Sequence, residues 1–274
     1  MKIVVIGGSG RIGSRLVRTL RQDDFAVVAA SPTLGVNTIT GEGLDQALQE
    51  ATVIVDVSNS PSLDGEDALR FFEASGRRLS AAGKAAGVQH HIALSIVGTD
   101  GLQSIGYFRA KKLQEDLIKD SGVPFSILRS TQFFEFIAGV VQDGSKDDVA
   151  ITPALGQPVS AIDVAKALAE LAAGEPLNRT VEVAGPERFR LCDIAAEVMT
   201  AYEDPRRLIA DWEALYFGAE LEGHSLLPAG DARIGGLRFE DWLRQTLEPG
   251  DVRAPAPEVG QGRRGSTEAG GSSP

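Results

Sequence analysis

Cysteine is nearly absent from this chain of 274 residues, because Cys192 is its only one. An intrachain disulfide is therefore excluded, as is typical of proteins from a reducing compartment. Histidine is scarce too, with 3 residues. His90 and His91 are adjacent, so a strand would point them to opposite faces and they could not share one metal. Nothing in the sequence has the ligand spacing of a zinc site. The sequence predicts no metal centre.

Positive charge and long apolar runs are also in short supply. The 27 Lys and Arg face 38 Asp and Glu, which gives a formal net charge of -11. Proteins that bind nucleic acid need a basic face for the phosphates, so nucleic acid is not an expected partner. No apolar run approaches the roughly 18 residues of a membrane span, and no signal-peptide pattern precedes the first strand. We expect a cytoplasmic protein that acts on a small-molecule substrate.

Short apolar runs alternate with amphipathic stretches along most of the chain. Such an alternation indicates βαβ units and predicts an α/β fold, a doubly wound parallel sheet with strand order 3-2-1-4-5-6. The runs that predict its strands are residues 2–6, 25–30, 36–39, 52–57, 90–95 and 125–129. Residues 1–247 are expected to form one Rossmann-like domain, and residues 248–274 a disordered tail rich in Pro, Gly, Ser and Arg.

A small C-terminal lobe is expected from about residue 149 to residue 247, where the elements become shorter. Trp212 and Trp242 are interpreted as packing anchors of its last helices. The helices predicted there are 161–173, 191–202, 211–223 and 239–247, with a strand at 180–184.

The most informative stretch is the turn after the first strand, Gly7-x-x-Gly10-x-x-Gly13. Glycines between a buried strand and an amphipathic helix are typical of a dinucleotide-binding loop. Gly7 would permit a tight turn, Gly10 would let a pyrophosphate approach the backbone, and Gly13 would let helix and strand pack closely. The helix N-terminus would offer N–H groups to the phosphates. A plain strand–helix turn is the alternative interpretation.

The end of the second strand favours NADP over NAD. An acidic residue there normally binds the ribose hydroxyls of NAD, whereas this chain has Ser31 and, close by, Thr33. Arg11 in the glycine loop could pair with a 2′-phosphate. Asn59, in the polar turn after the fourth strand, is a weaker candidate for contact with the cofactor, because that turn could also be a plain loop.

A second group of residues points to proton transfer. Tyr107 and Lys111 are four residues apart, so they project from one face of the predicted helix. A lysine ammonium beside a phenol would lower the phenol's pKa toward neutral pH. Ser95, at the end of the fifth strand, could hold a substrate oxygen. The alternative is that Tyr107 packs under a loop and Lys111 is a solvated surface charge.

Taken together, these motifs resemble the short-chain dehydrogenase/reductase superfamily, in particular its atypical and extended branch of NmrA-like NAD(P)-binding reductases. Tyr107-Phe108-Arg109-Ala110-Lys111 and Leu128–Phe134 are similar to that group as well. The resemblance covers roughly residues 2–247. It implies a catalytic trio of Ser95, Tyr107 and Lys111, with Lys111 also on the nicotinamide ribose. The cofactor-binding residues it implies are Gly7, Ser9, Gly10, Arg11, Ile12 and Gly13.

One departure from that group concerns the turn after the fourth strand. Conventional members have Asn-Asn-Ala-Gly there, and this chain has Ser58-Asn59-Ser60. Three phenylalanines after the sixth strand are candidates for an apolar substrate cleft, with Phe133 preferred, although such clusters are more often core. The predicted function is NADP(H)-dependent hydride transfer to or from a carbonyl or alcohol carbon. A non-catalytic NADP-binding redox sensor and a cofactor-retaining epimerase or dehydratase are the alternatives.

Overall fold

The central element is a seven-stranded sheet in which every pairing is parallel, with the order β11-β8-β5-β4-β3-β1-β2. The computed structural model describes residues 1–141, 148–217 and 219–247. The strands of this sheet are β1 (Lys2–Ile6), β2 (Ala26–Ala30), β3 (Val53–Asp56), β4 (His90–Ile96), β5 (Phe125–Ser130), β8 (Arg179–Ala184) and β11 (Arg233–Ile234). The predicted fold class, an α/β doubly wound parallel sheet, is confirmed.

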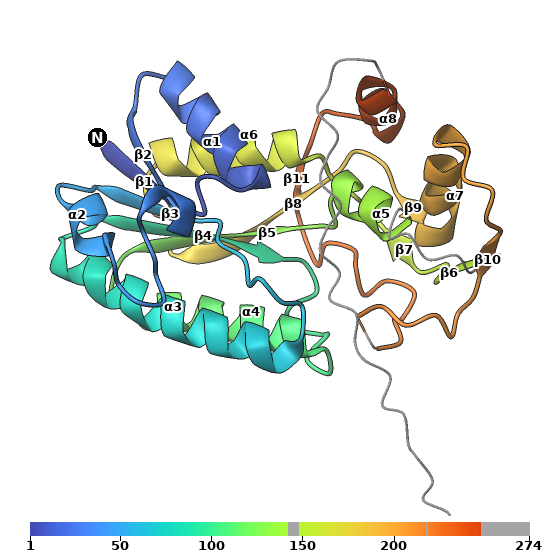
Figure 1. Cartoon of the computed structure of the whole chain (residues 1–274), viewed down its shortest axis with the longest axis horizontal. Helices are drawn as coiled ribbons and strands as arrows, with labels where there is room; N and C mark the ends of the chain where they lie inside the picture. Colours follow the sequence, from blue (N-terminus) through green and yellow to red (C-terminus); the bar gives the residue numbers. More distant parts are fainter. Residues whose placement is uncertain (142–147, 218, 248–274) are drawn as a thin grey trace, which may run out of the picture.

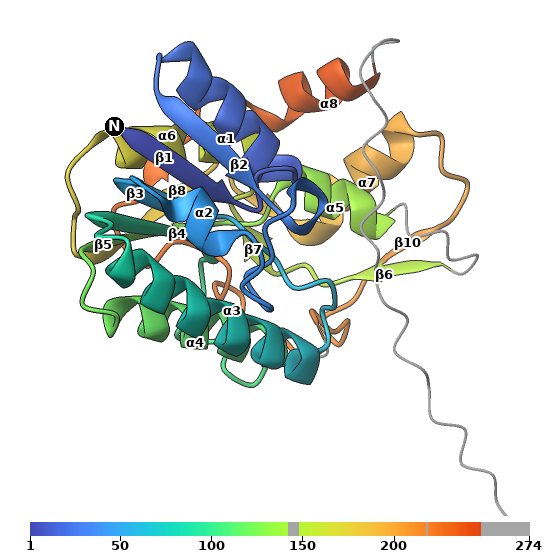
Figure 2. The same ribbon diagram turned by 60° about the vertical axis from the view of Figure 1, so that its left-hand side comes forward.

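Helices cover both faces of the sheet, as Figures 1 and 2 show. On one face lie α1 (Arg11–Gln22) and α6 (Ala161–Ala173), and on the other lie α3 (Gly65–Ala85) and α4 (Gly106–Lys119). Alternation along β1 explains the two layers. Ile3 and Val5 pack with Leu16 of α1, whereas Val4 packs with Leu79 of α3. Hydrophobic spacing predicts that Leu69, Phe72, Leu79 and Ala82 share the buried face of a helix over residues 66–86, but Leu69 is exposed.

The predicted third strand, residues 36–39, does not form. Asn37 Oδ1 accepts hydrogen bonds from the N–H groups of Ile39 (2.8 Å) and Thr40 (3.2 Å), which folds the chain into a turn. Gly41 and Gly43 follow with positive φ angles of 88° and 68° and continue the reversal into α2 (Leu44–Leu48). As a result β2 is the edge of the sheet. The other five predicted strands keep their predicted order, and β8 and β11 extend the sheet beyond β5.

The remaining elements gather beyond the carboxyl ends of the central strands (Figure 1). Phe134, Phe239 and Trp242 form an aromatic core there, with ring centroids 5.3–5.7 Å apart, so Trp242 is the packing anchor expected. The elements are α5 (Phe134–Val141), α7 (Leu191–Ala201), α8 (Phe239–Leu247), the pair β6 (Val149–Ile151) and β10 (Leu208–Ala210), and the pair β7 (Leu155–Gly156) and β9 (Phe189–Arg190).

The helix predicted at 211–223 is wrong. Asp211 accepts a hydrogen bond from Glu213 N (2.9 Å) and so favours a turn. Phe217 has a positive φ of 50°, which no helix allows. Trp212 is 60% exposed and anchors nothing. The predicted tail, 248–274, lies outside the described residues. Within the described part of the chain, no helix is both long and apolar enough to cross a membrane.

Candidate functional site

The glycine turn closes tightly between β1 and α1. The N–H groups of Gly7 and Gly8 both donate to the Ala30 carbonyl, at 2.8 and 3.0 Å, and Gly7 has a φ of 81°. A Cβ on Gly13 would lie 2.1 Å from the Gly7 carbonyl oxygen, so only glycine fits there. Gly10 precedes α1 in an extended conformation without any side-chain cap. The N-terminus of α1 therefore lies directly after the glycine turn, which is the arrangement of phosphate-binding turns.

Three hydroxyl groups join this turn to the end of β2. Ser9 Oγ donates to Ser31 Oγ (2.9 Å), Thr33 Oγ1 lies 3.0 Å from Ser31 Oγ, and Thr33 donates to Ser9 (3.3 Å). Ser31 is buried, whereas Ser9 and Thr33 are exposed. Arg11 is half-buried in the first turn of α1, immediately after the glycine turn. These positions supply hydroxyl and guanidinium donors, and neither the glycine turn nor positions 31 and 33 hold an acidic residue. Such a set of donors suits a nucleotide that carries a phosphate.

Tyr107 lies in the first turn of α4, and its phenol donates a hydrogen bond to Asn59 Oδ1. Its ring is stacked on Phe217, with centroids 6.1 Å apart, and meets Phe72 edge-on at 6.3 Å. Burial raises the pKa of Tyr107 above its ordinary value, and the hydrogen bond with Asn59 counteracts part of that increase. The lowering of this pKa that the sequence predicted is therefore not found.

Lys111, one turn further along α4, is buried. Its Nζ donates to the Leu94 carbonyl (2.8 Å) and to Gln114 Oε1, and it lies 4.5 Å from the centroid of the Phe72 ring. Burial lowers the pKa of Lys111 to about 8, although the carboxylates of Asp56 and Glu115 favour the charged form. The ammonium therefore hydrogen-bonds to the protein, and not to the Tyr107 oxygen.

A hydrogen-bonded chain connects Lys111 to the end of β3. Gln114 Nε2 donates to Asp56 Oδ2 (2.8 Å), and Asp56 Oδ1 accepts from the Ser58 hydroxyl (2.6 Å) and the Ser58 N–H (2.9 Å). Asp56 and Gln114 did not figure among the predicted site residues. Two signals could have identified them: Asp56 is a carboxylate at the end of an otherwise apolar strand, and Gln114 follows Lys111 by three residues on one helix face.

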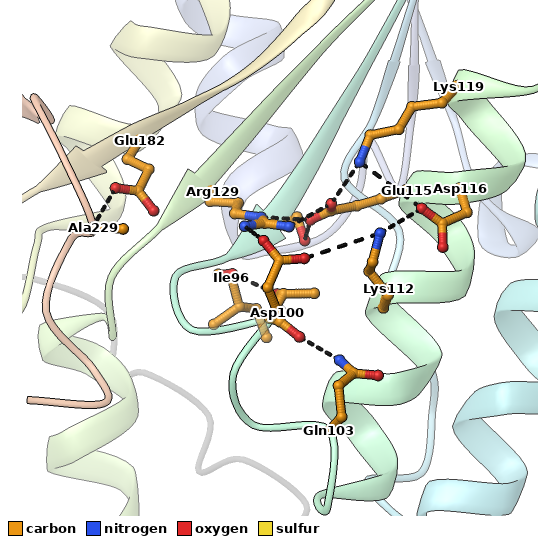
Figure 3. Close-up of polar contacts among 12 residues, drawn as sticks. Ile96, Asp100, Gln103, Lys112, Glu115, Asp116, Lys119, Arg129, Glu182 and Ala229 are labelled. Carbon is orange, nitrogen blue, oxygen red and sulfur yellow. Dashed lines mark hydrogen bonds and ion pairs between the residues drawn. The ribbon is translucent and has the colours of Figure 1, made fainter. Parts of the chain in front are cut away.

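Ser95 belongs to a different cluster, whose members Asp100, Glu115 and Arg129 are labelled in Figure 3. Its hydroxyl donates to Glu115 Oε1 (2.6 Å), and Glu115 forms a two-pronged ion pair with Arg129 at 2.8 and 2.7 Å. Arg129 also pairs with Asp100 (2.6 Å). Glu115 lies eight residues after Tyr107, which is about 12 Å along a helix. The Ser95 hydroxyl thus donates to Glu115 and the Tyr107 phenol to Asn59, so these two groups of the expected trio have separate hydrogen-bond partners.

The reason for this difference lies in the neighbouring strand. Ser95 pairs with Arg129 across the β4–β5 ladder, and the two side chains share one face of the sheet. The Arg129 guanidinium forms an ion pair with Glu115 on that face, and the Glu115 carboxylate accepts a hydrogen bond from the Ser95 hydroxyl. Neither Glu115 nor Arg129 was singled out from the sequence.

The three candidate cleft phenylalanines lie in different surroundings. Phe133 is half-buried against the core cluster that contains Ile12 and Leu16, on the α1 side of the sheet. Phe134 belongs to the Trp242 core. Phe136 is stacked on Phe217, with centroids 5.6 Å apart. Contact of Phe133 with substrate stays a prediction. We call Phe72, Tyr107, Phe136, Tyr216 and Phe217 the aromatic cluster.

Comparison with known proteins agrees with this geometry. A family model described as NAD(P)H-binding matches residues 7–175, from the glycine turn to just beyond α6. The photosystem II assembly factor Ycf39 of Cyanophora paradoxa is 27% identical over 213 residues, which are 71% of this chain and 66% of that protein. The chain thus spans slightly less than two thirds of that relative's length.

One further sequence relative is a reductase, and one solved structure has a similar fold. The (4-alkanoyl-5-oxo-2,5-dihydrofuran-3-yl)methyl phosphate reductase of Streptomyces griseus is 25% identical over 223 residues, 75% of each chain. A solved structure of a short-chain dehydrogenase/reductase superfamily protein from Agrobacterium tumefaciens, with bound NAD, has a TM-score of 0.69 at 15% identity and covers 90% of this chain and 96% of its own. At this identity the likeness shows a shared fold. The family model confirms the NAD(P)H-binding part of the resemblance stated from the sequence.

Proposed function

Because the chain belongs to the NAD(P)H-binding family, we propose that it is an NADP(H)-dependent oxidoreductase. It transfers hydride to or from a carbonyl or alcohol carbon of a small organic substrate. One observation carries the proposal: the phosphate-binding turn and the phenol meet at one short segment. A Cβ on Gly7 would lie 2.9 Å from the Ser58 nitrogen, and the next residue, Asn59, accepts the Tyr107 hydrogen bond.

The proposed cofactor site uses the turn and the end of β2. Gly7, Gly10 and Gly13 keep the turn free of side chains for the diphosphate, and Ile12 anchors α1 in the core behind it. For the adenosine ribose and its 2′-phosphate, Arg11 contributes charge and the hydroxyls of Ser9, Ser31 and Thr33 contribute hydrogen bonds. The nicotinamide supplies or accepts the hydride when it is bound.

The protein's own part is proton transfer and orientation. Tyr107 donates a proton to the carbonyl oxygen as it becomes an alcohol, or accepts it in the reverse direction. Asn59, its hydrogen-bond partner, holds the phenol at the carboxyl edge of the sheet. Lys111 supplies a positive charge one helical turn away, and Gln114 fixes its position. Ser95 takes no part in this step, because its hydroxyl donates to Glu115.

Replacing Tyr107 with Phe tests the proposal. The ring stays in the aromatic cluster but loses the proton, so kcat/KM for carbonyl reduction should fall about 10²- to 10⁴-fold. The Kd for NADPH, measured by fluorescence titration alongside NADH, should stay within about twofold, because the phenol is not one of the groups proposed to hold the phosphates.

Tyr202→Phe, at a tyrosine that is 41% exposed, is the matched control and should keep full turnover. Turnover by Tyr107→Phe at the level of the original protein would contradict the catalytic role. A wild-type protein that binds neither nicotinamide nucleotide would contradict the proposal as a whole.

A second candidate is a regulatory protein that binds NADP without turnover. Burial of Tyr107 and its raised pKa favour this alternative, because the phenol gives up its proton less readily. One relative is also named as an assembly factor and not as an enzyme. A regulator should bind NADPH yet show no carbonyl reduction, and Tyr107→Phe should then leave its cofactor affinity and its lack of turnover unchanged.

A further inference from the structure

A buried side-chain amide lies between the ammonium of Lys111 and the carboxylate of Asp56 and is hydrogen-bonded to both. Lys111 Nζ donates to Gln114 Oε1, and Gln114 Nε2 donates to Asp56 Oδ2 (2.8 Å). Lys111, Gln114 and Asp56 are 4%, 1% and 2% exposed, so solvent screens the two charges only weakly. Because an ammonium only donates and a carboxylate only accepts, the two charges admit a single orientation of the amide.

Asp56 is the main counter-charge of Lys111. Burial lowers the pKa of Lys111 to about 8, and of the two carboxylates that oppose this shift Asp56 acts more strongly than Glu115. Glu115 reaches Lys111 from the same helix but is already ion-paired. The other close neighbours of the ammonium are uncharged, namely the Leu94 carbonyl and the Phe72 ring. The charge of Lys111 therefore depends chiefly on Asp56.

The second oxygen of Asp56 holds the segment that joins the glycine turn to the Tyr107 phenol. Asp56 Oδ1 accepts from the Ser58 N–H (2.9 Å) and from the Ser58 hydroxyl (2.6 Å). Ser58 lies against Gly7, where a Cβ would be 2.9 Å from its nitrogen, and the next residue, Asn59, accepts from Tyr107. One carboxylate thus binds this segment with one oxygen and the amide with the other.

We propose that Asp56 is a positioning residue of the reaction: it keeps the Lys111 ammonium charged and in place through Gln114, while it holds the segment that carries Asn59. This deepens the proposed function and rests on it. Asp56 acts through Gln114 and Ser58 and not on the substrate. Its charge, and not only its shape, should therefore decide how Lys111 behaves.

Asp56→Asn tests the charge with little change of shape. The new amide keeps an acceptor for Ser58, but its NH₂ group faces the NH₂ group of Gln114. If the Gln114 amide turns over, its NH₂ group meets the Lys111 ammonium, so neither orientation satisfies both neighbours. Lys111 should then lose its proton more readily. In wild type, kcat/KM for carbonyl reduction should fall above about pH 8, and in Asp56→Asn this fall should begin at least about one pH unit lower.

Moving the charge to the neighbouring position should reverse this effect. In the double variant that combines Asp56→Asn with Gln114→Glu, the carboxylate at position 114 accepts from the Lys111 ammonium and from the NH₂ group at position 56. The fall in kcat/KM should return to the wild-type pH or to a higher one. Restoration by a relocated charge would not follow if Asp56 only filled space.

The pH dependence of stability gives a readout that needs no turnover. Between the pKa of Lys111 in the folded protein, about 8, and its ordinary value of 10.5, the unfolded chain binds more protons, so the free energy of unfolding rises with pH. Asp56→Asn should start this rise at least about one pH unit lower, and the double variant should move it back. His91 also interacts with the Asp56 charge, but burial lowers its pKa below the ordinary 6.5, so it stays neutral across this window.

Asp163→Asn is the matched control. Asp163 is a buried carboxylate in the first turn of α6 that also accepts from a hydroxyl group, that of Ser160 (2.9 Å), and from a backbone N–H, that of Leu237 (3.0 Å). Asp163→Asn should keep both wild-type pH profiles, because Asp163 has no contact with Gln114.

Three results would overturn the inference: wild-type profiles in Asp56→Asn, an equal shift in Asp163→Asn, or a double variant that behaves as Asp56→Asn does. If Asp56→Asn does not fold, the double variant decides, because it should fold with the wild-type profiles and its failure to fold would overturn the inference. Failure of the proposed function is recognised separately, as absent NADPH binding or as unchanged turnover in Tyr107→Phe, whereas the unfolding profiles are independent of turnover.

Discussion

At the scale of single residues, burial changes how readily the Lys111 ammonium loses its proton. Its ammonium is enclosed by Leu94, Gln114 and the Phe72 ring, and burial lowers its pKa from 10.5 to about 8. A group of this kind loses its proton far more easily than a surface lysine. Its charge, and any support that it gives to Tyr107, is therefore greatest below about pH 8.

This shift makes stability depend on pH. Between about pH 8 and 10.5 the unfolded chain keeps the Lys111 proton and the folded chain has lost it. Because the unfolded state binds more protons, the free energy of unfolding should rise with pH across this window, by up to about 3 kcal/mol. Denaturant unfolding at several pH values measures the rise.

Lys111→Met should abolish this rise. Lys112→Met is the control at the next position, where the side chain is 32% exposed, and it should retain the rise. Parallel pH profiles for wild type and Lys111→Met would show that the amine titrates normally in the folded protein.

At the scale of elements, the absence of a side chain at Gly13 lets the start of α1 pack directly against the Gly7 carbonyl of the glycine turn. A Cβ at this position would meet the Gly7 carbonyl at 2.1 Å and push α1 away from the turn. The first N–H groups of α1 would then no longer converge on one phosphate. Gly13→Ala should therefore weaken NADPH binding at least about tenfold, about 1.4 kcal/mol, as measured by fluorescence titration.

Gly236→Ala is the matched control, because no atom lies within 4 Å of a Cβ there and its φ is not positive. It should bind NADPH as the wild-type protein does. If Gly13→Ala also binds normally, the turn does not hold the phosphates.

The elements themselves could be predicted where hydrophobic periodicity was sustained. The helix predicted at 161–173 forms as α6, and Ser160 caps it by accepting a hydrogen bond from Asp163 N. The amphipathic helix predicted after the glycine turn forms as α1. Residues 36–39 and 211–223 were misassigned because the side chains of Asn37 and Asp211 accept local backbone hydrogen bonds, which compete with a strand or a helix.

The candidate site was predictable in part for a different physical reason. A glycine turn is governed by backbone sterics over a few residues, so its position can be read from spacing. The partners of Ser95 and Lys111 depend on side chains brought in from other elements, namely Arg129, Gln114 and the Leu94 carbonyl. No local pattern indicates which of these contacts forms.

At the scale of the whole molecule, the Glu115–Arg129 pair connects α4 to β5, and through Ser95 to β4 (Figure 3). The Glu115 side chain is 1% exposed. Burial alone would raise the pKa of Glu115, but hydrogen bonds from Arg129 and Ser95 lower it below 4.5. The stabilisation is therefore complete above about pH 4.5 and is lost as the pH falls through the lowered pKa.

Glu115→Ala should reduce the free energy of unfolding at pH 7 by about 3 kcal/mol, because it leaves the guanidinium of Arg129 with Asp100 as its remaining carboxylate partner. Chemical denaturation measures the loss. Asp116→Ala, which removes a carboxylate that is 46% exposed on the same helix, should cost less than about 1 kcal/mol. Equal losses in the two variants would show that the buried Glu115–Arg129 pair stabilises the fold no more than an exposed carboxylate does.

The Ala30 carbonyl, which accepts from both Gly7 and Gly8, gives the outermost strand of the sheet a part in ligand capture. Among the described strands β2 pairs with β1 alone, and strands at the edge of a sheet open locally more readily than central strands. Fraying of β2 would release the turn and displace Ser31 in the same event. Nucleotide affinity and the local opening of β2 are therefore linked equilibria. A change that makes β2 open more often should weaken nucleotide binding, and bound nucleotide should make β2 open less often.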